Sequence, residues 1–313
     1  EIRNGVPRIQ VKQGKILVVP SGEQGLEIDL QIGGHDAQIL FDDANSALAI
    51  DVRKEHLPGS DPTAGSPMTV VEAFSTTGTV HWLEVDQDAI QVSAGQRLAF
   101  VDERIATTSD STTTPSWISP KRVKWINADA ARDLAPLVSF DRPAVLSLQE
   151  QTDHRRPEIR SLTACSLAYL GDLRPLVTAL NDDRLKAYRR EQFATLRNVV
   201  ASGPESAVAV RDAFSARHGD RTDEFFRILW GYSPTELQAG ASNELVEHLL
   251  DESLDFRIVA IETLKQITGK SVTTFGPEQS KNSRRKAYLH WSSDAQKNRI
   301  AYKTTPAILE LTK

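Results

Sequence analysis

The apolar residues of this chain change their spacing partway along it. Between Pro7 and Asp102 they alternate with polar residues, as in segment 26–30 (LEIDL), so that they share one face of an extended strand. From Glu158 onward they recur at the helical interval of about 3.6 residues. Because strands and helices bury their apolar faces in different ways, the change predicts a multi-domain chain with a β region first and an α region second.

The β region contains seven or eight expected strands, separated by turns rich in glycine and small polar residues. Residues 56–67 hold three prolines and two glycines, and we expect them to form a loop. The connections between strands are too short for the crossovers that parallel strands need. The sequence therefore predicts an N-terminal antiparallel β sandwich, roll or barrel.

Short glycine-centred strand pairs recur in the β region. Segment 11–18 (VKQGKILV) is the first, and segments 74–80 (FSTTGTV) and 90–98 (IQVSAGQRL) follow. This pattern resembles the FecR-type domain of bacterial envelope signalling proteins, in which a V-x-A-G-Q turn recurs near the end. The resemblance covers about 95 residues. It implies a FecR-like β-domain over residues 1–105, although the sequence shows no identifiable sigma-factor-binding segment before it.

A polar segment follows the β region. Residues 106–116 (ATTSDSTTTPS) have no apolar period, which is typical of an exposed linker. Trp117 and Trp125 come soon after it and either clamp the linker onto a domain, the favoured interpretation, or form an exposed pair that binds a partner. We expect residues 106–157 to form a linker and connecting segment, with Trp117 and Trp125 as candidate interaction residues.

Four arginines recur in the helical region at intervals of 29, 32 and 36 residues. Arg160, Arg189 and Arg257 each precede a leucine by seven residues, and Arg221 approximates this pattern. The self-similarity resembles a short HEAT-like array, and this resemblance implies a C-terminal HEAT-like α-solenoid over residues 158–313. The repeated arginines either line an anion-binding groove or, as we favour, bond a carboxylate or carbonyl group of a neighbouring turn.

The end of the chain is expected to close this array. Gly269 fits the left-handed cap that ends a helix. A last helix over residues 284–291 would place Ala287, Tyr288 and Trp291 on one buried stripe. The segment is therefore predicted to act as a capping unit.

A basic run begins the last helix. Arg284, Arg285 and Lys286 are consecutive in the sequence. They form either a solvated helix face, which is the favoured interpretation, or a surface that touches phosphate or lipid head groups. We retain all three as candidate interaction residues.

Composition limits the chemistry that we expect. The chain of 313 residues has 37 Lys and Arg against 42 Asp and Glu, a net charge of −5, whereas nucleic-acid-binding proteins usually carry a strong basic field. The seven histidines lack the spacing of zinc ligands, and the single cysteine, Cys165, lies in an apolar helical pattern. No P-loop, dinucleotide-binding glycine motif or nucleophile elbow occurs. We predict no catalytic, cofactor-binding or metal-binding residues, and a protein that is not an enzyme.

The first residue is Glu1 and the only methionine is Met68, so we expect a leading segment, such as a signal or a membrane anchor, before residue 1. The sequence then predicts an extracytoplasmic, periplasmic module tethered to the inner membrane, which acts in protein–protein interaction, signal relay or scaffolding. The alternative is a carbohydrate- or anion-binding protein with its ligand held between the two domains. Nucleic acid is the least favoured partner.

Overall fold

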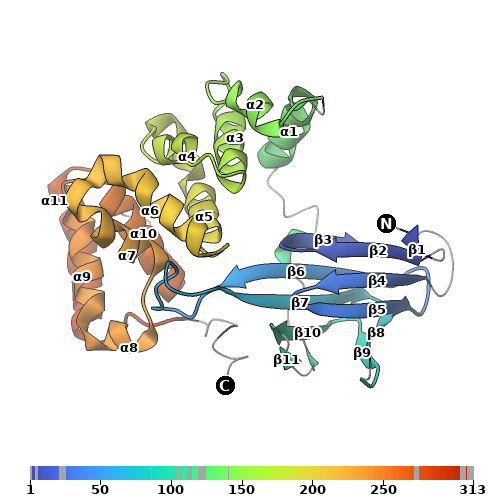
Figure 1. Ribbon diagram of the computed structural model, residues 1–313. Coiled ribbons are helices and arrows are strands. Elements are labelled where there is room, and N and C mark those ends of the chain that lie inside the picture. The colour runs from blue at the N-terminus through green and yellow to red at the C-terminus, as the bar shows by residue number, and fades with distance from the viewer. Residues whose placement is uncertain are drawn as a thin grey trace. The chain divides into compact units, whose positions relative to one another are not determined.

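The computed structural model describes residues 2–3, 6–20, 26–85, 87–102, 104–105, 108–110, 115–118, 125–139, 141–270, 275–303 and 308. The chain divides into two compact units. The β unit takes its residues from 1–55, 68–123 and 307–313, and the helical unit takes its residues from 56–67 and 124–306. The predicted order, a β region followed by a helical region, is confirmed (Figure 1).

The β unit contains two sheets. In the first sheet the strands lie in the order β1 (Ile2–Arg3), β2 (Val6–Val11), β4 (Glu27–Ile32), β5 (His35–Phe41), β8 (Thr79–Glu84) and β9 (Ile90–Ser93). In the second sheet they lie in the order β11 (Arg104–Ile105), β10 (Gln96–Val101), β7 (Met68–Thr77), β6 (Ala47–Glu55) and β3 (Gly14–Val18). The short β12 (Ser109–Asp110) also pairs with β10, and a 3-10 turn, η1 (Ser116–Ile118), follows.

The two sheets pack face to face over one apolar core. In β4, the side chains of Ile28, Leu30 and Ile32 are buried, while those between them are partly exposed. Trp82 of the first sheet meets Phe100 of the second edge to face, with 5.5 Å between ring centroids. The alternation seen in the sequence therefore places one face of each sheet in a shared interior, as in a β sandwich.

One strand pair runs parallel, and the prediction of a wholly antiparallel fold is wrong there. β2 pairs with β4 in parallel register, with Ile9 opposite Leu30 and Val11 opposite Ile32. The strand between them in the chain, β3, pairs with β6 in the other sheet. The chain leaves the first sheet after β2, forms β3 in the second sheet and returns to the first sheet as β4. This path provides the crossover that a parallel pair needs, although each single connection is short.

The helical unit is built from short helices. They are α1 (Trp125–Leu134), η3 (Ala135–Leu137), α2 (Ala144–Gln149), α3 (Pro157–Tyr169), α4 (Arg174–Ala179), η4 (Asp183–Tyr188), α5 (Arg189–Val200), α6 (Pro204–His218), η5 (Gly219–Arg221), α7 (Thr222–Trp230), α8 (Pro234–Glu236), η6 (Leu237–Ala241), α9 (Ser242–Glu247), η7 (His248–Leu250), α10 (Leu254–Thr268) and α11 (Lys281–Gln296). The later part of the segment expected as a linker and connecting segment, 106–157, is helical: α1 and α2 pack on α3 through Leu134, Leu148 and Ile159.

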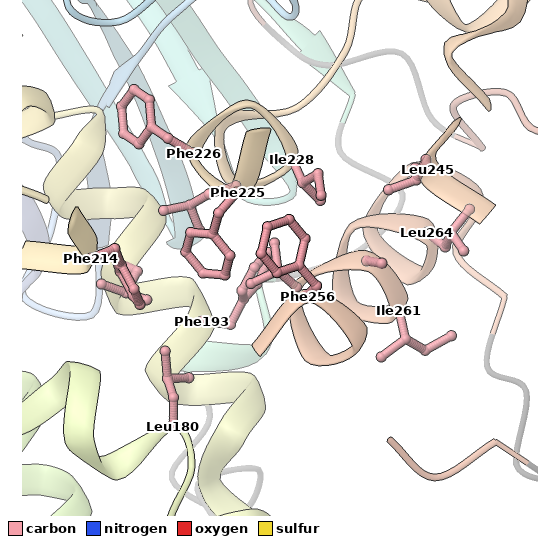
Figure 2. Close-up of a cluster of buried hydrophobic side chains, with 14 of the residues drawn as sticks. Leu180, Phe193, Phe214, Phe225, Phe226, Ile228, Leu245, Phe256, Ile261 and Leu264 are labelled. Atoms are coloured by element: carbon pink, nitrogen blue, oxygen red, sulfur yellow. The ribbon is translucent and has the colours of Figure 1, made fainter. Parts of the chain in front are cut away.

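Aromatic side chains hold the centre of the helical unit. The Phe225 ring of α7 lies 4.4 Å from that of Phe214 in α6 and 5.4 Å from that of Phe256 in α10, between ring centroids (Figure 2). Phe193 of α5 joins the same buried cluster. These rings fix α5 and α10 in one packed body, and the candidate site described below lies between these two helices.

The end of α10 and the buried face of α11 agree with the sequence. Gly269 adopts a left-handed conformation, with φ of 62°, and its amide donates to the Lys265 carbonyl at 2.8 Å. Ala287 and Trp291 are buried, and Tyr288 packs beside them. The predicted glycine cap and the predicted apolar stripe are both confirmed.

The segment between β6 and β7 belongs to the helical unit, and Gly59 fits closely there. Gly59 has φ of +88°, and a Cβ atom at this position would lie 2.7 Å from the backbone nitrogen of Ser233. Gly65, in the same segment, has no atom within 4 Å of the equivalent position and no positive φ. An added methyl group would therefore meet the Ser233 backbone at Gly59 but would have open space at Gly65, which makes Gly65 a suitable control.

We expect Gly59→Ala to lower the free energy of unfolding by about 1–3 kcal/mol, because the added methyl group meets the Ser233 backbone in a conformation that L residues rarely adopt. Gly65→Ala should leave stability unchanged or raise it by less than about 1 kcal/mol. Urea unfolding of the full chain measures both. Equal effects of the two substitutions would show that residue 59 does not pack as described.

Candidate anion-binding pocket

The repeated arginines have structural contacts, as the favoured interpretation predicted. Each guanidinium group donates to a backbone carbonyl of a neighbouring turn: Arg160 to Thr152 at 3.2 Å, Arg189 to Leu180 at 2.9 Å and Arg257 to Asp251 at 2.7 Å. The fourth repeat, Arg221, instead forms two hydrogen bonds to the carboxylate of Asp251. These side chains therefore bond groups near helix ends, and Arg160 also lines a pocket of the helical unit beside Asp172 and Arg174.

Arg160 also forms an ion pair with Asp182, with 2.8 Å between Nη2 and Oδ2. Hydrogen bonds from the Arg184 side chain, from the Arg184 amide and from Arg160 hold the pKa of Asp182 near 2, although partial burial of the carboxyl opposes them. A carboxylate with a lowered folded-state pKa stabilises the fold above its unfolded pKa of about 3.9, and this stabilisation is lost as the pH falls through the folded value.

We expect Asp182→Asn to destabilise the protein at neutral pH and to lose this effect between about pH 4 and pH 2. In that range the wild-type carboxylate itself becomes protonated, so the two proteins converge. Urea unfolding at a series of pH values measures the difference, with the exposed Asp212→Asn as control. A difference in stability that stays constant down to pH 2 would contradict the assignment.

The candidate interaction residues of the sequence do not come together in one site. Trp117 is half-buried in η1, and the Lys15 ammonium lies 5.6 Å from the centroid of its ring within the β unit. Trp125 begins α1, but its side chain lies outside the described part of the structure. Arg285 and Lys286 are exposed on α11.

Arg284 is not part of an exposed basic surface, and its grouping with Arg285 and Lys286 is wrong. Its side chain is buried; Nε donates to the Gln279 carbonyl at 2.9 Å and Nη1 donates to the Leu249 carbonyl at 3.1 Å. The helical period explains the difference, since residue 284 lies on the same face as the buried Trp291, seven positions later. Burial lowers the pKa of the Arg284 guanidinium.

A pocket of about 490 Å³ lies between α5 and α10 in the helical unit. Its lining is unusually cationic. The charged and amide side chains around it are those of Arg190, Arg197 and Asn198 from α5, of Glu262 and Lys265 from α10, and of Lys270 just beyond the end of α10. Four of these groups are cationic and one is a carboxylate, so the pocket favours an anion.

Arg197 is the unusual member of this set. Its Nη2 atom donates to the Thr263 hydroxyl at 3.3 Å, and its guanidinium carbon lies 4.7 Å from the centroid of the Phe193 ring. Its Nε atom is buried and has no hydrogen-bond partner in the structure. Within the described ranges, no carboxylate forms an ion pair with this guanidinium. Arg197 is thus a half-buried cation whose Nε atom is buried and whose set of donors is partly unsatisfied.

The electrostatic consequence is a shifted titration. Burial lowers the pKa of the Arg197 guanidinium to about 10, and the nearby Tyr302 hydroxyl and Glu262 carboxyl offset only part of this effect. Desolvation disfavours the charged form of any ionisable group. The contacts that Arg197 makes within the protein therefore do not fully offset the free energy of desolvating its charge.

The other cations of the pocket are better compensated. The Lys265 ammonium lies 2.6 Å from the carboxylate of Glu262, and the Lys270 ammonium lies 2.7 Å from that of Asp294. Arg190 is exposed at the start of α5. Three partly solvated cations therefore surround one half-buried cation, an arrangement that strengthens the attraction for an anionic group at Arg197.

Arg197 was not among the residues expected from the sequence to take part in binding. It lies on α5 between the buried side chains of Leu196 and Val199. A signal did exist: Phe193 and Arg197 are four residues apart, so that on a helix the guanidinium can stack on the ring. The pocket itself depends on α10, which lies about 65 residues later in the chain.

No protein-family model, no curated protein and no solved structure matches the chain. In the described part of the chain, no cluster of three or more His, Cys, Asp or Glu side chains is arranged to hold a metal ion. Nor does any described helix have the length and apolar character needed to cross a membrane.

Proposed function

We propose that this protein is a binding module whose helical unit holds an anionic group in the pocket between α5 and α10. The observation that carries the proposal is the half-buried Arg197 guanidinium on the pocket wall, which forms no ion pair with a carboxylate of the described residues and whose Nε atom lacks a hydrogen-bond partner. A bound anion would supply the missing acceptor and the missing negative charge together. Perturbed ionisable groups in a concave site are typical of functional sites.

The dimensions of the pocket support a ligand larger than a simple ion. Small-molecule sites commonly enclose about 300–1,000 Å³, and this pocket encloses about 490 Å³. Asn198 and Gln266 add neutral polar groups beside the cations. The pocket therefore suits a small phosphorylated or carboxylated molecule, or an anionic side group of a larger partner. This proposal keeps the anionic ligand of the alternative expected from the sequence but locates it within the helical unit instead of between the two domains.

The wider role that we propose follows the resemblances seen in the sequence. A FecR-like β-domain followed by a HEAT-like helical array would form an extracytoplasmic interaction, signal-relay or scaffold module, tethered to the inner membrane and acting on a protein partner. The similar carbonyl contacts of Arg160, Arg189 and Arg257 support a repeated unit. Cell fractionation of the native protein tests its location, and recovery in the cytoplasmic fraction would exclude this role.

Titration calorimetry at low salt tests the pocket, with inorganic phosphate and glucose 6-phosphate as probes and glucose as the neutral control. We expect saturable binding of at least one anion. Arg197→Gln should weaken it by at least tenfold, because it removes the one cation among the described residues of the lining that has no carboxylate partner and is partly shielded from water. The exposed Arg299→Gln removes the same charge outside the pocket and should leave affinity unchanged. Absence of binding, or equal affinity in both variants, would refute the proposal.

A stability measurement separates binding from structure at Arg197. Arg197→Met should raise the free energy of unfolding of the ligand-free protein by about 1 kcal/mol, since it replaces an uncompensated half-buried charge with an apolar side chain that can pack on Phe193. Thr263 keeps its hydrogen bond to the Ile228 carbonyl.

The matched contrast is Arg189→Met, which removes a buried arginine that donates to the Leu180 carbonyl. This substitution should destabilise the protein by about 2–3 kcal/mol, because it leaves a buried acceptor without a donor. Urea unfolding measures both variants. If Arg197→Met destabilises the protein as strongly as Arg189→Met, Arg197 has a structural role instead.

A further inference from the structure

We propose that the β unit carries a second binding site, a groove at one end of the sandwich that takes an acidic saccharide. The groove encloses about 1060 Å³. It lies where β2, β4 and β10 end and β7 begins, so several strands contribute to one open rim. Its lining includes the polar and charged side chains of Gln10, Lys12, Gln31, Lys54, Asp102 and Arg104.

The charge of the groove is opposite to that of the unit that contains it. The segments 1–55, 68–123 and 307–313 together have 11 Lys and Arg against 17 Asp and Glu. Lys12, Lys54 and Arg104 nevertheless gather in the groove, where Asp102 is the only acidic side chain among the described residues of the lining. Across the described residues, no ion pair joins these three cations to a carboxylate. They are therefore available to a negatively charged ligand.

The backbone at the rim is held in a costly conformation. Asp102 has φ of 49°, which is uncommon for a residue other than glycine. Its amide donates to the Thr69 carbonyl at 2.8 Å, and its Oδ1 accepts the Thr69 amide at 2.7 Å. A residue keeps such a backbone conformation only where several surrounding contacts fix it, and such residues are concentrated at ligand-binding sites.

A buried network supports Asp102 from inside the sandwich. The imidazole of His35 uses Nε2 to donate to the Asp102 carbonyl, at 2.5 Å, and its Nδ1 lies 3.1 Å from the carboxylate of Glu84. Trp82 donates to the same carboxylate at 2.8 Å. Because a carbonyl only accepts, the network fixes His35 with its Nε2 proton toward Asp102. His35 is thus a positioning residue for the rim and does not itself reach the groove's surface.

The remaining lining favours a saccharide over a peptide. Gln10 and Gln31 lie side by side, with 2.9 Å between the Nε2 of Gln10 and the Oε1 of Gln31, and together offer amide donors and acceptors for hydroxyl groups. Asp102 keeps its second carboxylate oxygen, Oδ2, for the same purpose. Of the lining residues that the structure describes, only Val11 and Ile32 have apolar side chains, so this part of the groove offers few of the apolar anchors by which peptides are usually held.

Fluorescence-labelled full-length protein and four probes test this proposal: an oligo-uronate, a sulfated heparin fragment, a neutral malto-oligosaccharide and a poly-glutamate peptide. We expect binding of the oligo-uronate, the heparin fragment or both, with affinity that falls as salt rises. The triple variant Lys12→Gln, Lys54→Gln and Arg104→Gln should weaken this binding by at least tenfold. Thermal unfolding should confirm that the variant is folded.

The matched control removes three exposed lysines of the helical unit, with Lys186→Gln, Lys281→Gln and Lys297→Gln, and should leave affinity unchanged. Arg197→Gln should also leave it unchanged, which separates this groove from the pocket between α5 and α10. An equal loss in the control triple variant, equal binding of the neutral saccharide, or stronger binding of poly-glutamate would overturn the proposal. The last result would assign the groove to an acidic peptide.

Discussion

A helix leaves its last four carbonyl groups without partners, and a unit made of many short helices multiplies this deficit. Buried and half-buried arginines satisfy part of it here. Arg189 donates to a carbonyl at the end of α4, Arg284 donates to the end of η7, and Arg257 donates to the turn that follows η7. Burial lowers the pKa of all three guanidinium groups, but their hydrogen bonds hold the helix ends together. The packing of the helical unit depends on these contacts.

Arg197 stands apart from this pattern because its guanidinium caps no helix. It has one hydrogen bond to a side-chain hydroxyl and one aromatic contact, and its Nε atom is buried without an acceptor. Arg189 also has a buried nitrogen, Nη2, without a hydrogen-bond partner, but this atom lies 3.8 Å from the Asp183 carboxylate, whereas no carboxylate of the described residues forms an ion pair with Arg197. Native proteins rarely leave buried donors unsatisfied, and the pocket beside this donor is the place where an acceptor from outside the chain can enter.

The fold was predictable from sequence wherever the constraint is local. Alternation in residues 26–32 predicted a strand, and Gly269 predicted a helix end, because each depends on a few neighbouring residues. The parallel pairing of β2 with β4 was not predictable in this way, since it depends on which sheet receives β3. Arg284 was expected on an exposed basic surface with Arg285 and Lys286, but the helical period places it on the buried face of α11. Arg197 was missed because its partners on α10 are remote in the sequence.

The two sites that we propose differ in physical character, and this difference bears on how each would act. The pocket between α5 and α10 has a half-buried cation without a carboxylate partner among the described residues, so an anion gains most from pairing with this charge in a partly desolvated setting. The groove of the β unit presents solvated cations, whose attraction is screened within a Debye length of about 8–10 Å at physiological salt. The first favours a small, well-defined anionic group, and the second favours an extended polyanion with charges spread along it. A module with both sites would bind a small anion in its helical unit and an extended polyanion on its β unit.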